Sequence, residues 1–298
     1  MSDAGQAQPT RTRDIRAVAA GSAALIAAAL SVGQLVTAQL VGILSRGGQG
    51  DSPTGHVAEA ALIVWTAASS VGLAAAIPSL RVHPVRRRRK LVLSGGAAFG
   101  AFLSVPVAAG VAAWSQMYGG GLSQPSVAWL VMLGVGLGAV VAWFVISSRA
   151  AMWSLICWLV VGWLLVLASA AAAPDTAPTI GHFDPGPAWS DGARAWLALL
   201  VLTSAAALVG AGLGVGAKMF GWGNGRGRRL RLPRLAAALV AGPLLMLTSY
   251  GLAGVSAGGF GWTQTATLAV GVVAAGAASY GLLTVLRRTC RPKASKSS

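Results

Sequence analysis

Long apolar runs, separated by short polar segments, divide this 298-residue chain. Eight such runs cover roughly residues 18–44, 57–80, 91–116, 127–147, 150–173, 195–217, 235–257 and 262–286. Ala, Leu, Val and Gly dominate each run, without the strict alternation of a barrel strand. A helix needs about 20 apolar residues to cross a bilayer. The pattern therefore predicts an all-α fold, a polytopic membrane helix bundle of about eight transmembrane helices.

The overall composition supports a membrane protein over a soluble one. The chain is 55% hydrophobic and only 10% charged, whereas ordinary soluble domains are about 25% charged. So few charged residues cannot cover a soluble domain of this size. Abundant Ala, Gly and Arg, with few Lys and Asn, indicate GC-rich coding and hence a bacterial inner (cell) membrane.

Charge is distributed unevenly between the two sides of the predicted spans. Of the 23 Lys and Arg residues, all but Arg46 and Arg194 fall on one side, together with both ends of the chain. Short loops rich in Lys and Arg stay in the cytoplasm. We therefore expect both termini to be cytoplasmic, including the polar tail 1–14 and the basic tail 289–298.

Two basic loops are the predicted topology determinants. The first contains Arg86, Arg87, Arg88, Arg89 and Lys90, and the second contains Arg228 and Arg229. A loop of roughly ten residues between membrane helices offers no fold that presents charge to a nucleic-acid groove, so we expect no nucleic-acid partner. The expected partners are the lipid bilayer, its anionic headgroups and another membrane protein.

Chemistry-bearing residues are sparse. The predicted spans contain no Asp, Lys or Arg, and their one Glu, Glu59, lies at a predicted outer mouth. This argues against a proton-driven antiporter with a buried carboxylate. The cysteines, Cys157 and Cys290, lack the neighbouring histidines of a zinc site. We expect no enzyme activity, no catalytic residue and no cofactor.

One polar constellation lies on the predicted outer face. His56 and Glu59 are three residues apart, and His182 and Asp184 come from the longest outer loop. An i, i+3 carboxylate–imidazole pair has the spacing of metal ligands in helix bundles. It is also the ordinary composition of a solvated helix end, which is the interpretation we favour.

Uncharged polar residues within the spans are the candidates for a substrate path: Gln34, Thr66, Thr203 and Tyr250. Single Ser and Thr residues usually bond back to their own helix. Gln34 does so less easily, so it should face the bundle interior and find a partner on another helix.

The arrangement of loops suggests two halves, 15–148 and 149–288, each of four spans with a basic second loop. Sliding the chain by 137 residues aligns Thr66 with Thr203 and Pro106 with Pro243. These are the two prolines well inside predicted spans. A 4+4 parallel repeat about the membrane normal would explain the match, and coincidence is the alternative. Paired helix interruptions at matching positions of two halves indicate a binding site between them, so Pro106 and Pro243 are added to the candidate substrate path.

Two functions remain. The first is a transporter or permease subunit for an uncharged, zwitterionic or lipid-like solute, with its path between the halves. The second is a non-transporting membrane scaffold, an assembly or regulatory partner acting through its basic loops or its outer loop. Eight spans exceed what an anchor needs, so we favour transport.

Overall fold

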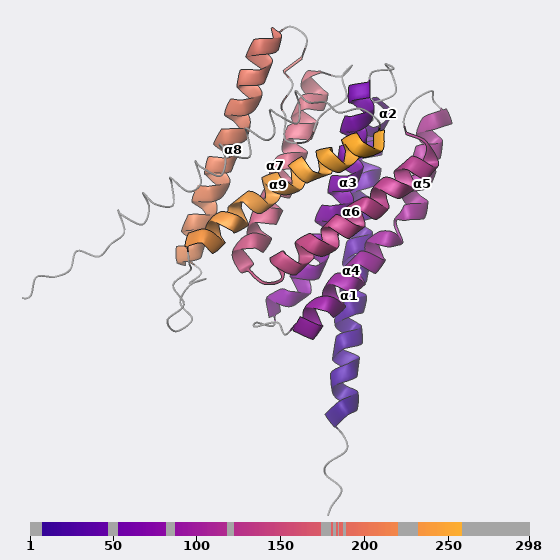
Figure 1. Cartoon of the computed structure of the whole chain (residues 1–298), viewed down its shortest axis with the longest axis vertical. Helices are drawn as coiled ribbons and strands as arrows, with labels where there is room; N and C mark the ends of the chain where they lie inside the picture. Colours follow the sequence, from indigo (N-terminus) through magenta and orange to yellow (C-terminus); the bar gives the residue numbers. More distant parts are fainter. Residues whose placement is uncertain are drawn as a thin grey trace, which may run out of the picture.

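The protein is seen in a computed structural model, which describes residues 8–46, 53–81, 87–117, 122–173, 180, 183, 185–186, 189–219 and 232–257. Throughout these residues the regular structure is helical (Figure 1). The α-helices are α1 (Gln8–Leu40), α2 (Ile43–Arg46), α3 (Pro53–Ala76), α4 (Arg87–Phe102), α5 (Val105–Met117), α6 (Gln124–Val145), α7 (Arg149–Ala172), α8 (Asp191–Met219) and α9 (Leu232–Ala257), and a short 3-10 helix, η1 (Ile77–Arg81), follows α3.

Six helices in this part of the chain are long and apolar enough to cross a membrane. Their apolar segments are Ala17–Leu40, His56–Ser79, Arg87–Trp114, Gln124–Val145, Arg149–Ala172 and Gly192–Leu213. They coincide with the first six predicted spans, so the protein is a multi-pass integral membrane protein. The seventh predicted span is helical as α9. The eighth, 262–286, and the tail 289–298 lie outside the described residues.

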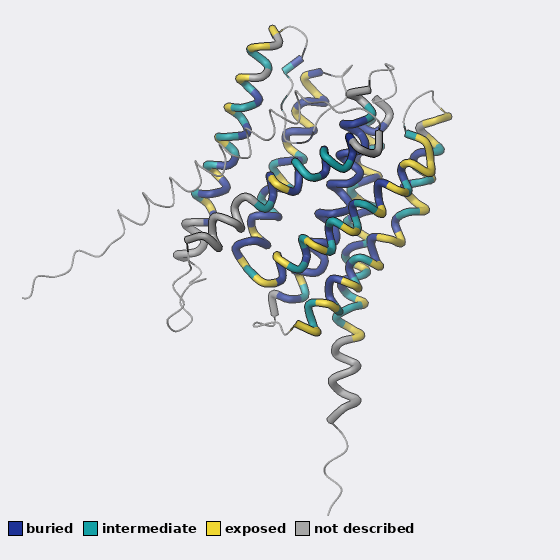
Figure 2. Tube along the Cα trace, viewed as in Figure 1, coloured by how far each residue is buried: buried dark blue, intermediate teal, exposed yellow. Residues whose placement is uncertain are grey.

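The third helix occupies the centre of the bundle. Every residue of α3 from 57 to 76 is buried, and the helix packs against α1, α4, α6, α7 and α9. In Figure 2 it is dark blue along this stretch, while helices at the edge such as α5 and α8 alternate between buried and exposed turns. A helix that is apolar and small on every face can be enclosed this way. The sequence of α3 fits, because Ala, Ser, Val and Gly dominate it.

Glycines bring α6 against this central helix. A Cβ on Gly134 would lie 2.6 Å from the Val64 carbonyl oxygen, and a Cβ on Gly138 would lie 2.7 Å from that of Ala68. Neither position has room for a side chain. Small residues four apart let membrane helices approach closely where there is no hydrophobic force to join them. The spacing Gly134–Gly138 therefore fixes which face of α6 meets α3.

The third predicted span is two helices rather than one. A turn at Leu103 and Ser104 separates α4 from α5, and Pro106 is the second residue of α5. Its missing N–H is tolerated there, because the first turn of a helix has no internal partners for its N–H groups. The Ser104 hydroxyl donates to the Ala101 carbonyl (2.6 Å) and bonds the Ser31 hydroxyl of α1 (2.9 Å). The third predicted span thus remains one apolar segment, Arg87–Trp114, interrupted just before the proline placed well inside it.

The seam between the fourth and fifth spans is confirmed as a tight turn. α6 ends at Val145, and Ser148 caps α7 with its hydroxyl accepting from the Ala151 N–H (3.4 Å). At the same end of the bundle, α1 begins at Gln8, within the predicted polar tail, and its first turns project beyond the bundle (Figure 1). Residues 1–7 lie outside the described part.

Candidate functional site

The Gln34 side chain joins three helices in the interior. Its Nε2 donates to the Ser70 hydroxyl of α3 (2.8 Å), and its Oε1 accepts from the Trp163 indole N–H of α7 (3.0 Å). The Ser70 hydroxyl in turn donates to the Thr66 carbonyl (2.7 Å). The expectation that Gln34 faces the interior and bonds another helix is confirmed. An amide can donate and accept at once, which suits it to bridge a hydroxyl and an indole.

Polar groups form a stripe along one side of α3. Glu59, Thr66 and Ser70 are separated by seven and four residues, which places them on one helix face. Thr66 is fully buried and its hydroxyl donates to the Ile63 carbonyl (2.9 Å). Because Ser70 bonds Gln34, this face is turned toward α1. The enclosed helix thus carries a carboxyl near its start and hydroxyls near its middle.

An aromatic junction lies beside this stripe. The rings of Trp65 and Trp163 are 6.3 Å apart at 48°, a tilted arrangement typical of favourable aromatic pairs. Gly162 makes room for it, because a Cβ there would lie 2.7 Å from the Trp65 ring and 2.9 Å from the Met246 methyl of α9. Helices α3, α7 and α9 therefore meet at one point.

Tyr250 fastens the segment after α7 to α9. Its side chain is buried, and its hydroxyl accepts a hydrogen bond from the backbone N–H of Ile180 (2.7 Å). Ile180 is itself fully buried. This hydrogen bond ties Ile180, in the predicted outer loop, to α9.

The remaining predicted path residues lie on three other helices, in different surroundings. Thr203 on α8 is partly exposed and bonds the carbonyls of Leu199 (2.8 Å) and Leu200 (3.0 Å) in its own helix. Pro106 is exposed on α5, while Pro243 is buried in α9. α5 packs on α6 and α1, whereas α9 packs on α3, α7 and α6.

The two prolines of the paired-proline hypothesis have different surroundings among the described residues, since Pro106 is exposed on α5 and Pro243 is buried in α9. Their shared role in a path stays a prediction. Thr66 and Thr203, aligned by the same shift, also have different surroundings, since one is central and the other peripheral. The 4+4 repeat and the two four-helix halves stay predictions.

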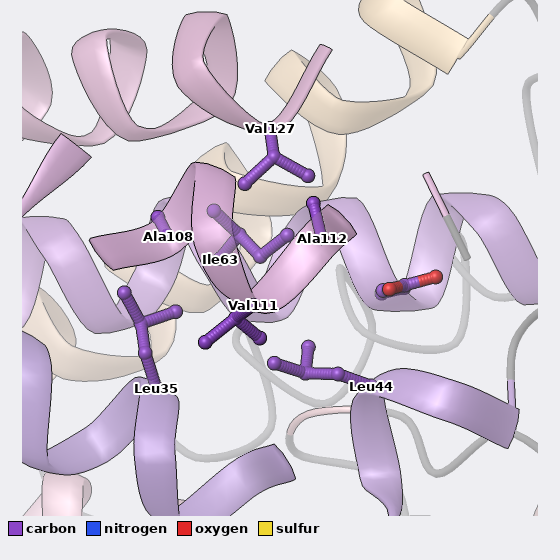
Figure 3. Close-up of a pocket in the computed structure, with 8 residues that line it drawn as sticks. Leu35, Leu44, Ile63, Ala108, Val111, Ala112 and Val127 are labelled. Atoms are coloured by element: carbon purple, nitrogen blue, oxygen red, sulfur yellow. The ribbon is translucent and has the colours of Figure 1, made fainter. Parts of the chain in front are cut away.

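A small cavity lies near the N-terminal end of α3. It has a volume of about 10 Å³ and is lined by Glu59 and by apolar side chains of α1, α2, α3, α5 and α6: Leu35, Leu44, Ile63, Ala108, Val111, Ala112 and Val127 (Figure 3). Glu59 is only 6% exposed. One side of its carboxyl accepts from the Leu122 backbone N–H, and its Oε2 has no hydrogen-bond partner among the described residues.

Glu59 was predicted to lie at an outer mouth. In the structure it lies near the start of α3 and is buried. The apolar run "AALIVW" that follows Glu59 predicts a membrane span, but it does not distinguish an enclosed helix from one that faces lipid. Which helices close over the carboxyl depends on tertiary packing of α2 and α5, which no local pattern encodes.

The metal hypothesis gains nothing from the described residues. They contain no group of three or more His, Cys, Asp or Glu side chains that could hold an ion. The His56 Nδ1 is buried and has no hydrogen-bond partner in the described part of the chain, so it does not bond the Glu59 carboxyl. His182 and Asp184 lie outside the described part of the chain.

At the opposite end of the bundle, the basic run begins α4. Lys90 donates to the Ser147 hydroxyl (2.5 Å), and its ammonium lies 5.5 Å from the centroid of the Trp143 ring. Arg87 and Arg88 are exposed. Arg86, Arg228 and Arg229 lie outside the described residues. A Lys held over a Trp ring suits a membrane interface, where both side chains are enriched.

Comparison with known proteins yields no relative: no protein-family model, no curated protein and no solved structure matches the chain.

Proposed function

We propose that the protein is a transporter, or a permease subunit, for an uncharged, zwitterionic or lipid-like solute. The observation that carries the proposal is the polar stripe on an enclosed helix. Glu59, Thr66 and Ser70 lie on one face of α3, and Glu59 has an oxygen without a partner among the described residues. Polar groups buried within membrane spans are costly and mark substrate or ion pathways.

The path that this stripe supports differs from the one between two halves. It follows the interface of α1 and α3, from the cavity at Glu59 to the Gln34–Ser70–Trp163 group. A solute moving along it would exchange hydrogen bonds with the Gln34 amide and the Ser70 hydroxyl. Neither group is charged, which fits a solute without net charge.

The proposed setting is a bacterial inner membrane with both termini in the cytoplasm. The basic residues at 86–90 then lie among anionic headgroups, each contributing about 1 kcal/mol near the surface. The exposed Arg87 and Arg88 side chains are free to make these contacts.

A second candidate function, the non-transporting scaffold, is favoured by a different observation. The backbone of α3 is in close contact with α6 at Gly134 and Gly138, and the cavity at Glu59 is close to the volume of a single water molecule. Close packing of this kind suits a rigid assembly or regulatory partner. The two candidates make opposite predictions for solute uptake.

A growth and uptake comparison tests the choice. A strain lacking the gene is compared with one carrying the wild-type gene, across nutrient and toxic solutes. Under the transport proposal, one solute class separates the two strains, and the Gln34→Ala and Ser70→Ala variants lose most of that difference at normal expression.

Thr203→Ala is the matched control, because its hydroxyl bonds only its own helix among the described contacts. It should behave as the wild type. If no solute separates the strains, while Arg87→Ala with Arg88→Ala abolishes another phenotype of the gene, the scaffold is the correct function.

A further inference from the structure

The carboxyl of Glu59 is enclosed in an apolar site with a single donor. The Leu122 N–H satisfies one side of it, while Oε2 faces no hydrogen-bond partner among the described residues. The other residues that line the cavity are aliphatic. An ionised carboxylate moved into such surroundings loses its hydration and gains one hydrogen bond, so it needs a positive partner.

The neighbouring elements supply no such partner within the described residues. The lining residues from α1, α2, α5 and α6 carry no charge. On α3 itself, His56 lies one turn before Glu59, and its Nδ1 has no hydrogen-bond partner where the structure is described. Arg46 ends α2, two residues after the lining Leu44, and its side chain lies outside the described part. A positive ion must therefore come from outside the described protein.

Size and ligand number decide which ion fits. Ca²⁺ takes six to eight oxygen ligands, and Mg²⁺ needs a near-ideal octahedron. The site offers the two oxygens of one carboxyl and a cavity of about 10 Å³, enough for one water at most. A hydrated metal cation does not fit. A proton needs one oxygen lone pair and no cavity, and Oε2 has that lone pair free.

We propose that Glu59 is a proton-binding site, and that proton binding and release there drive the solute movement proposed above. An O–H bond forms between Oε2 and a proton taken from the outer aqueous side. The same bond breaks when the proton leaves, so the carboxylate is restored. Glu59 lies six residues into α3, about 9 Å along the helix from Pro53, which makes the outer side the near source.

The fold provides a wall of the cavity that can move. Ala108, Val111 and Ala112 all belong to α5, which is separated from α4 by the turn at Leu103 and Ser104. Rotation of α5 about this turn would open the site without disturbing α4. The Ser31–Ser104 hydroxyl contact (2.9 Å) ties the turn to α1, so opening the site and loosening the α1–α3 path are one movement.

Carbodiimide labelling of the full-length protein tests proton binding without reference to any solute. Dicyclohexylcarbodiimide is apolar and adds to a protonated carboxyl, forming a stable acylurea without a leaving group. We expect labelling of Glu59, identified by peptide mass spectrometry, which declines several-fold as the pH is raised. Glu59→Gln should abolish it, and Asp191→Asn, at the start of α8, should leave it unchanged.

Infrared spectroscopy supplies a second readout on the same samples. The wild type should show the C=O stretch of a neutral carboxylic acid in apolar surroundings, shifted in D₂O and missing from Glu59→Gln. Glutamine keeps the size of the side chain and an acceptor for the Leu122 N–H, so this variant should fold. Absence of both the label and the band from folded wild-type protein would overturn the site.

Uptake of solute into proteoliposomes then tests whether transport is coupled to a proton gradient, separately from whether transport occurs at all. For the solute class that the growth comparison identifies, an imposed proton gradient should raise initial uptake several-fold in the wild type and have no effect on Glu59→Gln. Equal uptake by both proteins, with or without a gradient, would overturn proton coupling and leave transport standing. If the wild type moves no solute, transport fails, and labelling and infrared spectra still decide whether Glu59 binds a proton.

Discussion

A single side chain, that of Gln34 on α1, links two other helices in the interior of this bundle. Its amide completes the hydrogen bonding of Ser70 and of the Trp163 indole at once. Removing it leaves an indole N–H without an acceptor inside a membrane protein. Interhelical hydrogen bonds in membranes contribute about 0.6 kcal/mol on average and up to about 1.7 kcal/mol.

We therefore expect Gln34→Ala to lower the free energy of unfolding by about 1–3 kcal/mol, because two such bonds are lost. The measurement is unfolding of the purified protein by sodium dodecyl sulfate in mixed micelles. Thr203→Ala, which removes hydrogen bonds within one helix only, should change it by less than about 0.5 kcal/mol. Equal losses in the two variants would show that Gln34 does not bridge helices.

A second residue-scale prediction concerns Gly242, which precedes Pro243 in α9. A Cβ at this position would overlap the Trp158 ring of α7. Overpacking of this kind costs about 1–3 kcal/mol. We expect Gly242→Ala to lower the free energy of unfolding by that amount in the same assay.

Gly251 in the same helix is the matched control, because a Cβ added there would have nothing within 4 Å. Gly251→Ala should therefore be neutral or slightly stabilising, since alanine favours helix more than glycine does. A Gly242→Ala variant as stable as Gly251→Ala would mean that α9 does not pack on Trp158.

The sequence predicts the burial of some residues but not of others. The interior position of Gln34 could be predicted, because a long amide within an apolar run needs a partner on another helix. The burial of Glu59 could not be predicted. His56 and Glu59, three residues apart at the start of a helix, have the same sequence pattern whether water or α5 covers them. The same limit applies to Pro106, whose exposure depends on how α5 turns after Ser104.

Among the elements, α3 and α6 pack closely, and the glycine spacing of α6 allows it. Gly134 and Gly138 meet the α3 backbone at Val64 and Ala68, while Gly136, on another face of α6, has nothing within 4 Å. We expect Gly138→Ala to destabilise the protein by about 1–3 kcal/mol and Gly136→Ala to change stability by less than about 0.5 kcal/mol. Thermal unfolding followed by circular dichroism in detergent compares the two directly.

The positions of the helices along the chain could largely be predicted from hydropathy. The first six spans coincide with apolar helices, and the turn at Ser148 falls where two predicted spans adjoin. Which helix lies at the centre was not accessible, because α1, α6 and α7 are similarly apolar. The central position of α3 depends on its backbone contacts with Gly134 and Gly138 of α6. These contacts depend on the sequence of α3 as much as on the two glycines.

For the whole molecule, the distribution of charge predicts one orientation. A reporter fused after residue 298, or inserted at 85–90, should report the cytoplasm, and one inserted at 178 should report the exterior. Paired alkaline phosphatase and green fluorescent protein fusions make this measurement. An exterior signal at only one terminus would make the number of spans odd and exclude the 4+4 repeat.

The enclosure of α3 also bears on how the protein is made. Chains emerge from the ribosome at about 5–20 residues per second, so α9 follows α3 after about 8–30 s. During that interval the face of α3 that packs on α9 lacks its partner. The hydroxyls of α3 are already satisfied, because Thr66 donates to Ile63 and Ser70 to Thr66 within the helix. The central helix can therefore enter the membrane before its later partners, because its hydroxyls need no partner on another helix.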